Sequence, residues 1–224
     1  MDYNEGAILL VNKPLEWTSF DVVKKIRNVT RAAKVGHAGT LDPLATGLLI
    51  VCTGKFTKQI SLIQDAEKEY TGTFFLGATT PSGDRETEVD ETFDIHGVQV
   101  TDIYNAAKQL TGVIMQVPPL HSAVKVNGQR AYKMARRGSD HKLEAKPVTI
   151  REFEITEINL PYIKFRVSCS KGTYIRSLAV DFGKALNAGG YLFELCRTRI
   201  GEHQLKDAME MKDVLSLAPV KAVE

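Results

Sequence analysis

Residues 36–52 read GHAGTLDPLATGLLIVC, a glycine-rich loop that runs directly into a continuous apolar stretch. The glycines leave room for a ligand or a second backbone segment to approach closely. The apolar residues 48–52 predict a buried strand. One carboxylate, Asp42, lies inside the loop. Because an aspartate before a proline is most often a turn residue, the loop by itself favours a structural role for Asp42.

The segments on either side of this loop predict a mixture of strands and helices. Residues 7–11 predict a strand, and Thr18 or Ser19 can cap a helix that runs to about Arg31. The patterns predict further strands at 70–76, 148–158, 163–169 and 193–199, and helices at 57–63, 101–110, 130–137, 174–186 and from 205 onward. The polar stretch 78–97 predicts a mobile connection. Short turns between strands favour an α+β fold with a mixed, mostly antiparallel sheet.

Length and composition place the chain among ordinary globular proteins. It has 224 residues, of which 43% are hydrophobic and 25% are charged, and we predict one domain over 1–224. No apolar run reaches the about 18 residues of a membrane span, and the N-terminus lacks a signal-peptide pattern. Three dispersed cysteines and five dispersed histidines predict neither disulfides nor a metal site. We therefore expect a cytoplasmic protein.

Two basic segments stand out although the net charge is only +2. Residues 22–34 and residues 125–137 each hold five basic side chains and no acidic one. These side chains are Lys24, Lys25, Arg27, Arg31 and Lys34, then Lys125, Arg130, Lys133, Arg136 and Arg137. Such segments suit a phosphate backbone. A solvated helix face explains each segment equally well.

Residues 36–54 resemble the catalytic motif of the TruB family of tRNA pseudouridine synthases, which isomerise uridine 55 in the T loop. A block similar to another motif of that family precedes it at 12–19, and further blocks follow at 68–77, 118–136, 172–178 and 195–201. The resemblance implies the pseudouridine synthase fold, in which helices flank a central mixed sheet that carries an RNA-binding cleft. It also implies that residues 78–145 include RNA-contacting insertions.

The resemblance implies a catalytic pair. Pseudouridylation breaks the bond between N1 of uracil and the ribose, and a carboxylate suits that task. Asp42 matches the catalytic aspartate of the family, and it could attack the sugar, attack the base or remove a proton. Arg176 matches an arginine placed against that aspartate, where a guanidinium keeps a carboxylate ionised. A phosphate contact or a surface charge are the alternatives for Arg176.

Four residues match substrate contacts of the family. A base must leave its stack before it can react, and it then needs a flat surface to stack on. Tyr70 matches the stacking tyrosine, although a strand tyrosine among apolar neighbours is by default a core residue. Tyr174 matches a residue near the reacting uridine, Leu195 one that walls the uracil pocket, and His37 one that contacts the RNA as the base flips. Weaker RNA-binding candidates are Lys13, which could instead support the active-site loop, Lys125, Arg130, Arg136 and Arg137.

The resemblance implies no metal and no cofactor, and a partner that is the T stem-loop of tRNA. Only 23 residues follow Gly201, so we expect no C-terminal RNA-binding PUA domain. We expect a monomer without an obligatory protein partner and without membrane attachment. Two alternatives remain. The chain could be a tRNA-folding chaperone without chemistry, or a guide-RNA-directed synthase subunit, which the missing PUA domain and basic tails disfavour.

Overall fold

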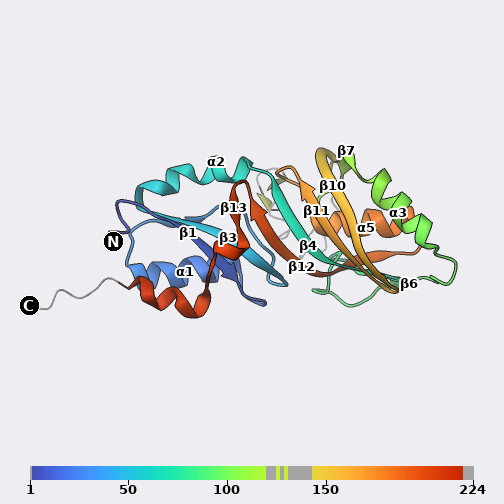
Figure 1. Ribbon diagram of the computed structural model, residues 1–224, viewed down its shortest axis with the longest axis horizontal. Helices are drawn as coiled ribbons and strands as arrows, with labels where there is room; N and C mark the ends of the chain where they lie inside the picture. The colour runs from blue at the N-terminus through green and yellow to red at the C-terminus, as the bar shows by residue number, and fades with distance from the viewer. Residues whose placement is uncertain (1, 120–124, 127–128, 131–142, 219–224) are drawn as a thin grey trace, which may run out of the picture. The chain divides into compact units, whose positions relative to one another are not determined.

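The computed structural model describes residues 2–119, 125–126, 129–130 and 143–218, and Figure 1 shows its ribbon. The chain divides into two compact units. Unit 1 comprises Met1–Tyr70 and Leu195–Glu224, and unit 2 comprises Thr71–Glu194. Both boundaries fall inside strands, β4 (Lys68–Leu76) and β12 (Gly190–Ile200). That residues 1–224 form a single catalytic domain stays a prediction.

Unit 1 is built around strand β3 (Ala45–Thr53), which follows the glycine-rich loop. β1 (Ile8–Lys13) and β2 (Val35–His37) both pair with β3 in the antiparallel sense. The distal half of β12 pairs with β3 in parallel, and β14 (Met209–Glu210) pairs with β1 in parallel. The short strand β13 (His203–Gln204) pairs back on β12. The loop is therefore held between paired strands at both of its ends.

Helices cover both faces of these strands (Figure 1). α1 (Ser19–Thr30) starts at a capping box formed by Thr18 and Asp21 and ends at Arg31 in the left-handed conformation. α1 packs on one face with the 3₁₀ helix η3 (Met211–Leu217). η1 (Gly54–Gln59) leads into α2 (Ile60–Asp65), whose Ile60 and Ile63 pack on the other face.

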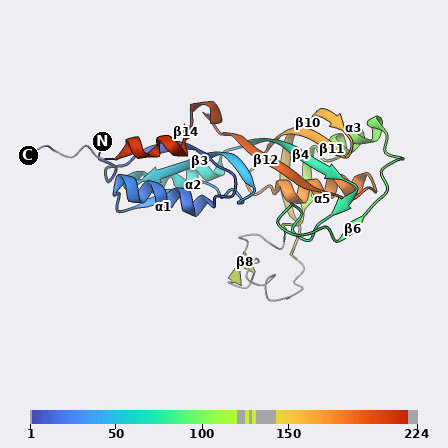
Figure 2. The same ribbon diagram turned by 90° about the horizontal axis from the view of Figure 1, so that it is seen from below.

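Unit 2 holds the strands β11 (Tyr162–Cys169), β10 (Lys146–Asn159) and β7 (Gly112–Gln116) beside its parts of β4 and β12. Among the described residues of unit 2, the helices are α3 (Val100–Gln109) and α5 (Ile175–Ala185), and Figure 2 shows α5 running along the strands. Phe74 of β4 stacks on Phe165 at 4.1 Å between ring centroids and meets Phe182 of α5 at 5.4 Å. This aromatic core fixes α5 against the sheet.

The predicted α+β class with a mixed sheet is confirmed. A mobile connection over 78–97 is wrong, because β5 (Ala78–Thr79) pairs with β6 (Glu91–Thr92) and both Ser82 and Asp84 are buried. The helix expected at 130–137 is wrong for Arg130, which lies in β9 (Gln129–Arg130) paired with β8 (Lys125–Val126). Residues 131–137 lie outside the described residues. The C-terminal helix is instead two 3₁₀ segments, η2 (Leu205–Asp207) and η3.

Candidate active site

The backbone on both sides of Asp42 is anchored by hydrogen bonds to residues of the N-terminal segment. The Ser19 hydroxyl accepts a hydrogen bond from the Leu41 N–H at 2.9 Å and donates one to the Leu41 carbonyl at 3.1 Å. The Pro43 carbonyl accepts a hydrogen bond from the backbone N–H of Glu16 at 2.8 Å. The carboxylate thus projects from a residue whose two neighbours are both held in place.

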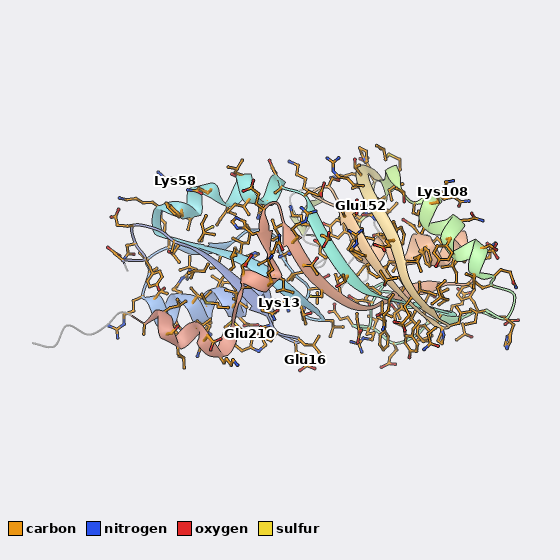
Figure 3. The ribbon with its side chains drawn as sticks, in the orientation of Figure 1. Lys13, Glu16, Lys58, Lys108, Glu152 and Glu210 are labelled. Carbon is orange, nitrogen blue, oxygen red and sulfur yellow. The ribbon has the colours of Figure 1, made fainter. Side chains whose placement is uncertain are left out.

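Lys13, which is labelled in Figure 3, is a buried residue of β1 whose side chain contacts this loop. Its ammonium donates to the carbonyls of Pro14 at 2.9 Å, Trp17 at 2.6 Å and Pro43 at 3.4 Å. Burial lowers the pKa of Lys13 to about 8, and the charge of Asp42 partly opposes that shift. Its complete burial favours support of the loop over contact with a phosphate group.

His37 lies at the end of β2, on the N-terminal arm of the loop. Its Nδ1 is buried and has no hydrogen-bond partner among the described residues. Burial lowers the pKa of His37 below its usual value, and the positive charge of Arg197 lowers it further. A backbone hydrogen bond with Gly39 partly opposes this lowering of the pKa, and the net effect favours the neutral imidazole.

The other predicted residues of unit 1 lie on strands next to the loop. Leu195 of β12 is opposite Ala45 in the parallel pairing with β3, and its carbonyl accepts a hydrogen bond from the Thr46 hydroxyl at 3.3 Å. Tyr70 is the last residue of the first stretch of unit 1 and is buried, with 8% of its surface exposed. Asp42 itself is half-buried.

In unit 2, Arg176 is buried at the start of α5. Its Nε lies 3.6 Å from the Oδ2 atom of Asp84, and its Nη1 donates to the Ser82 carbonyl at 3.2 Å. Both side chains of the ion pair are less than a tenth exposed. The ion pair with Asp84 and the hydrogen bond to Ser82 therefore fix the guanidinium. Because Arg176 is buried, it is not the surface charge that the sequence left open as an alternative.

Tyr174 occupies the N-cap position of α5. It has no side-chain cap of its own, and its backbone N–H instead donates to the Oε1 atom of Gln116 at 2.7 Å. The Nε2 atom of Gln116 is buried without a hydrogen-bond partner in the described part of the chain. The start of α5, with both Tyr174 and Arg176, is thus positioned by side chains from distant segments of unit 2.

The structure distributes the predicted residues between the two units. Unit 1 holds Lys13, His37, Asp42, Tyr70 and Leu195, and unit 2 holds Tyr174 and Arg176. The pairing of Asp42 with Arg176 stays a prediction, because the two residues belong to different units. Lys125 and Arg130 lie in β8 and β9, whereas Arg136 and Arg137 lie outside the described residues.

The sequence analysis did not predict the supporting role of four side chains, which contact the Asp42 loop or the start of α5: Ser19, Asp84, Gln116 and Arg197. Ser19 and Arg197 lie inside the recognised motif blocks, so their motifs were the signal that could have revealed them. Asp84 gave no signal, because it lies in a stretch rich in other acids. Gln116 lies in β7, a strand that the sequence analysis did not predict.

The described ranges contain no cluster of three or more His, Cys, Asp or Glu side chains arranged to hold a metal ion. Within the same ranges, no helix has the length and apolar character needed to cross a membrane.

Comparison with known proteins gives one consistent result. A family model described as TruB family pseudouridylate synthase (N terminal domain) matches residues 27–175. The protein named tRNA pseudouridine synthase B of Flavobacterium johnsoniae is 54% identical over 217 residues, which cover 94% of this chain and 95% of that protein. Its namesake from Phocaeicola vulgatus is 51% identical over 218 residues, 95% of this chain and 93% of its own length.

Solved structures with the same fold give a matching result. A chain from a crystal structure of a Cbf5-Nop10-Gar1 complex superposes with a TM-score of 0.75 at 29% identity, over 96% of this chain. A chain from an H/ACA RNP bound to a substrate RNA containing 2'-deoxyuridine superposes with a TM-score of 0.70 at 27% identity, over 93% of this chain. The present chain spans about half the length of these two chains, 55% and 52%.

Proposed function

Because the chain belongs to the TruB family of pseudouridylate synthases, we propose that it converts uridine 55 in the T loop of tRNA to pseudouridine. The isomerisation breaks the bond between N1 and C1′ and forms a bond between C5 and C1′. The proton on C5 is lost and N1 takes one up, so atoms balance without a co-reactant. The reaction needs a carboxylate, a site for an extruded base and a grip on RNA.

The anchored loop around Asp42 is the observation that carries this proposal. Catalysis by a carboxylate depends on holding it in the reactive geometry before the substrate arrives. The backbone neighbours of Asp42 are bound by Ser19 and by the N–H of Glu16, while Asp42 as a residue is half-buried. A turn residue with only a structural role would not need this support from a separate segment. We therefore assign Asp42 as the catalytic carboxylate.

We assign Arg176 as the cation that stabilises the ionised carboxylate. Its burial and its ion pair with Asp84 support this role, because a buried guanidinium stays charged and the ion pair fixes the orientation of its planar fork of donors. The experiment compares Arg176→Lys with Asp84→Asn. Loss of catalytic rate in both variants, at unchanged RNA affinity, supports the assignment, and a wild-type rate in Arg176→Lys contradicts it.

Three side chains are assigned to the extruded uridine. Tyr70 provides the stacking surface, which is worth about 1–3 kcal/mol per base. Leu195 walls the uracil pocket, and Tyr174 contacts the reacting nucleoside. The fixed backbone at each position, in β4, in β12 and at the N-cap of α5, supports these roles. His37 is assigned to contact the RNA, and its position at the end of β2, where the loop begins, supports this role.

The basic segments 22–34 and 125–137 are assigned to the phosphate backbone of tRNA. In α1, the side chains of Lys24 and Arg27 are exposed and so available to phosphates. The variant with Arg130, Arg136 and Arg137 all changed to Glu tests the second segment. Each lost phosphate contact reduces the slope of log Kd against log salt by about one. An unchanged slope would remove this segment from the RNA interface.

We further propose that the enzyme acts in the cytoplasm as a monomer without an obligatory protein partner. Its three cysteines, Cys52, Cys169 and Cys196, are free, which fits a reducing compartment. Light scattering of the pure protein, with and without tRNA, tests the oligomeric state. A stable dimer, or activity that appears only after a cell extract is added, would contradict this part of the proposal.

The decisive experiment is chemical mapping of pseudouridine in tRNA incubated with the pure protein. Asp42→Asn keeps the shape of the side chain and removes its charge. We expect its rate to fall by about 10⁴-fold, the order found when a catalytic carboxylate is removed. Asp213→Asn, at an exposed carboxylate of η3 in the same unit, is the control and should keep the wild-type rate. Full activity of Asp42→Asn would show that the carboxylate is wrongly assigned. Tight tRNA binding by the wild type without any pseudouridine would instead favour the chaperone alternative.

A further inference from the structure

Arg197 is a buried arginine of β12 that the reaction as described does not use. Only 1% of its surface is exposed. Its Nε donates to the carbonyl of Leu48 at 2.8 Å, its Nη2 to that of Gly39 at 3.0 Å and its Nη1 to that of Thr40 at 3.4 Å. Gly39 and Thr40 precede Asp42, and Leu48 follows it in β3. One guanidinium therefore ties together the two arms of the loop that carries the carboxylate.

The backbone geometry explains how Arg197 reaches this position. Arg197 is opposite Gly47 in the parallel pairing of β12 with β3. A Cβ atom on Gly47 would lie 2.4 Å from the Arg197 carbonyl oxygen and 2.7 Å from its nitrogen, so only glycine permits this approach. Gly39, on the other arm, is 3.5 Å from the guanidinium by the same measure. Glycines thus stand at both points where Arg197 meets the loop.

The chemistry of the contact requires an arginine rather than any hydrogen-bond donor. Burial of a positive charge is costly unless each donor is satisfied. In the part of the chain that the structure describes, the acceptors of Arg197 are backbone carbonyls on two separate segments. A guanidinium presents its donors in a planar fork and can reach three such acceptors at once, whereas an ammonium is a compact point charge on a flexible stem. The fork therefore sets the distance between the two arms.

We propose that Arg197 is a positioning residue for the isomerisation, which acts by fixing the backbone of the Asp42 loop and not by touching the substrate. This proposal rests on the assignment of Asp42 as the catalytic carboxylate. Arg197 binds the loop at Gly39, before Leu41, and at Leu48, after it, while Ser19 binds Leu41 itself. A displacement of about 1 Å at a reacting group can cost about 10²-fold in rate. Loosening of this loop should therefore be visible in catalysis before it is visible in RNA binding.

The test uses Arg197→Lys and Arg197→Met, with Arg199→Lys and Arg199→Met as matched controls. Arg199 lies two residues further along β12 and is part of the same unit, but it pairs with Glu67 at 2.8 Å and with the Gly201 carbonyl, away from the loop. Three quantities are measured: the single-turnover rate of pseudouridine formation on a T stem-loop, the Kd for the same RNA, and the thermal midpoint. Arg197→Lys keeps the charge and remains informative if Arg197→Met fails to fold.

We expect Arg197→Lys to lose about 10²-fold in single-turnover rate with an unchanged Kd, while both Arg199 variants keep the wild-type rate. A third variant, Arg197→Ala, tests chemical rescue: we expect guanidinium chloride, far below denaturing concentrations, to restore part of its rate, whereas sodium chloride at equal concentration does not. If Arg197 had a purely structural role, its variants would have a lower thermal midpoint, but each folded molecule would keep the wild-type rate. A wild-type rate in Arg197→Lys, or an equal loss in Arg199→Lys, overturns the proposal. Full activity of Asp42→Asn would instead refute the assignment of Asp42.

Discussion

Replacement of Gly47 by alanine should destabilise unit 1 more than the same change at Gly39. Both glycines have a positive φ, 101° at Gly47 and 92° at Gly39, so an alanine pays about 1–3 kcal/mol of backbone strain at either position. Only at Gly47 does the new Cβ collide with backbone, at 2.4 Å and 2.7 Å from atoms of Arg197. At Gly39 the nearest atom is 3.5 Å away, which is ordinary contact. Over-packing adds about 1–3 kcal/mol, so the two variants should differ in free energy of unfolding by about 2 kcal/mol.

Tryptophan fluorescence during urea unfolding measures this difference directly. Trp17 is the sole tryptophan of the chain, and it packs against the core of α1, β1 and β3 in unit 1. With a slope of about 2 kcal/mol per molar urea, a difference of about 2 kcal/mol separates the two midpoints by about 1 M. Coincident midpoints would refute the reasoning. They would show that β12 moves away from β3 without cost, and that the close pairing at Arg197 does not hold the loop.

Three further predictions follow from the same contacts. Ser19→Ala should lower the rate of pseudouridine formation with little change in Kd for the T stem-loop. Thr18→Ala, the control, removes only the helix cap at a cost of about 1 kcal/mol and should leave the rate intact. Equal rates in the two variants would contradict this prediction. The pKa of Lys13 is about 8 in the folded protein and 10.5 in a free side chain, so the unfolded chain binds more protons between these pH values, and stability should rise there by up to about 3 kcal/mol. Urea titrations from pH 7.5 to 10.5 should show a flatter rise for Lys13→Met, and identical slopes would rule out the buried ammonium. Gln116→Ala leaves the N–H at the start of α5 without its acceptor and should cost about 1–3 kcal/mol, measured by circular dichroism during denaturation; no loss would mean that water replaces the side chain.

Local chemistry explains which parts of the fold the sequence could predict. The sequence predicts α1 near its true bounds because Thr18 is a good N-cap residue and the apolar residues after it recur at helical spacing. The strands β3, β10 and β11 were recognised because their apolar patterns are long and their turns are short. β7 was missed because it is a short edge strand whose Val113 and Met115 are exposed, so it lacks the pattern of a buried strand.

Contacts between distant segments explain what the sequence could not predict. The loop sequence by itself favoured a turn for Asp42, and only the motif blocks along the rest of the chain suggested its catalytic role. The parallel pairing of Leu195 with Ala45 joins opposite ends of the chain, and no local pattern encodes such a partner. Asp84 looked like one of many solvated acids, since its burial depends on Arg176, which comes much later in the sequence. Of the supporting side chains, Ser19 and Arg197 lie inside motif blocks, whereas the roles of Asp84 and Gln116 become visible only in the tertiary structure.

Ser19 and Arg197 hold the loop around Asp42 through hydrogen bonds to its main-chain atoms. Ser19 and Arg197 do not bond to the side chains of Thr40, Pro43 or Leu44, because their hydrogen bonds go to backbone carbonyls and one backbone N–H. Randomising positions 40 and 44 should therefore yield libraries rich in folded variants whose carboxylate keeps its place. Side chains at these two positions can therefore vary without displacing the carboxylate.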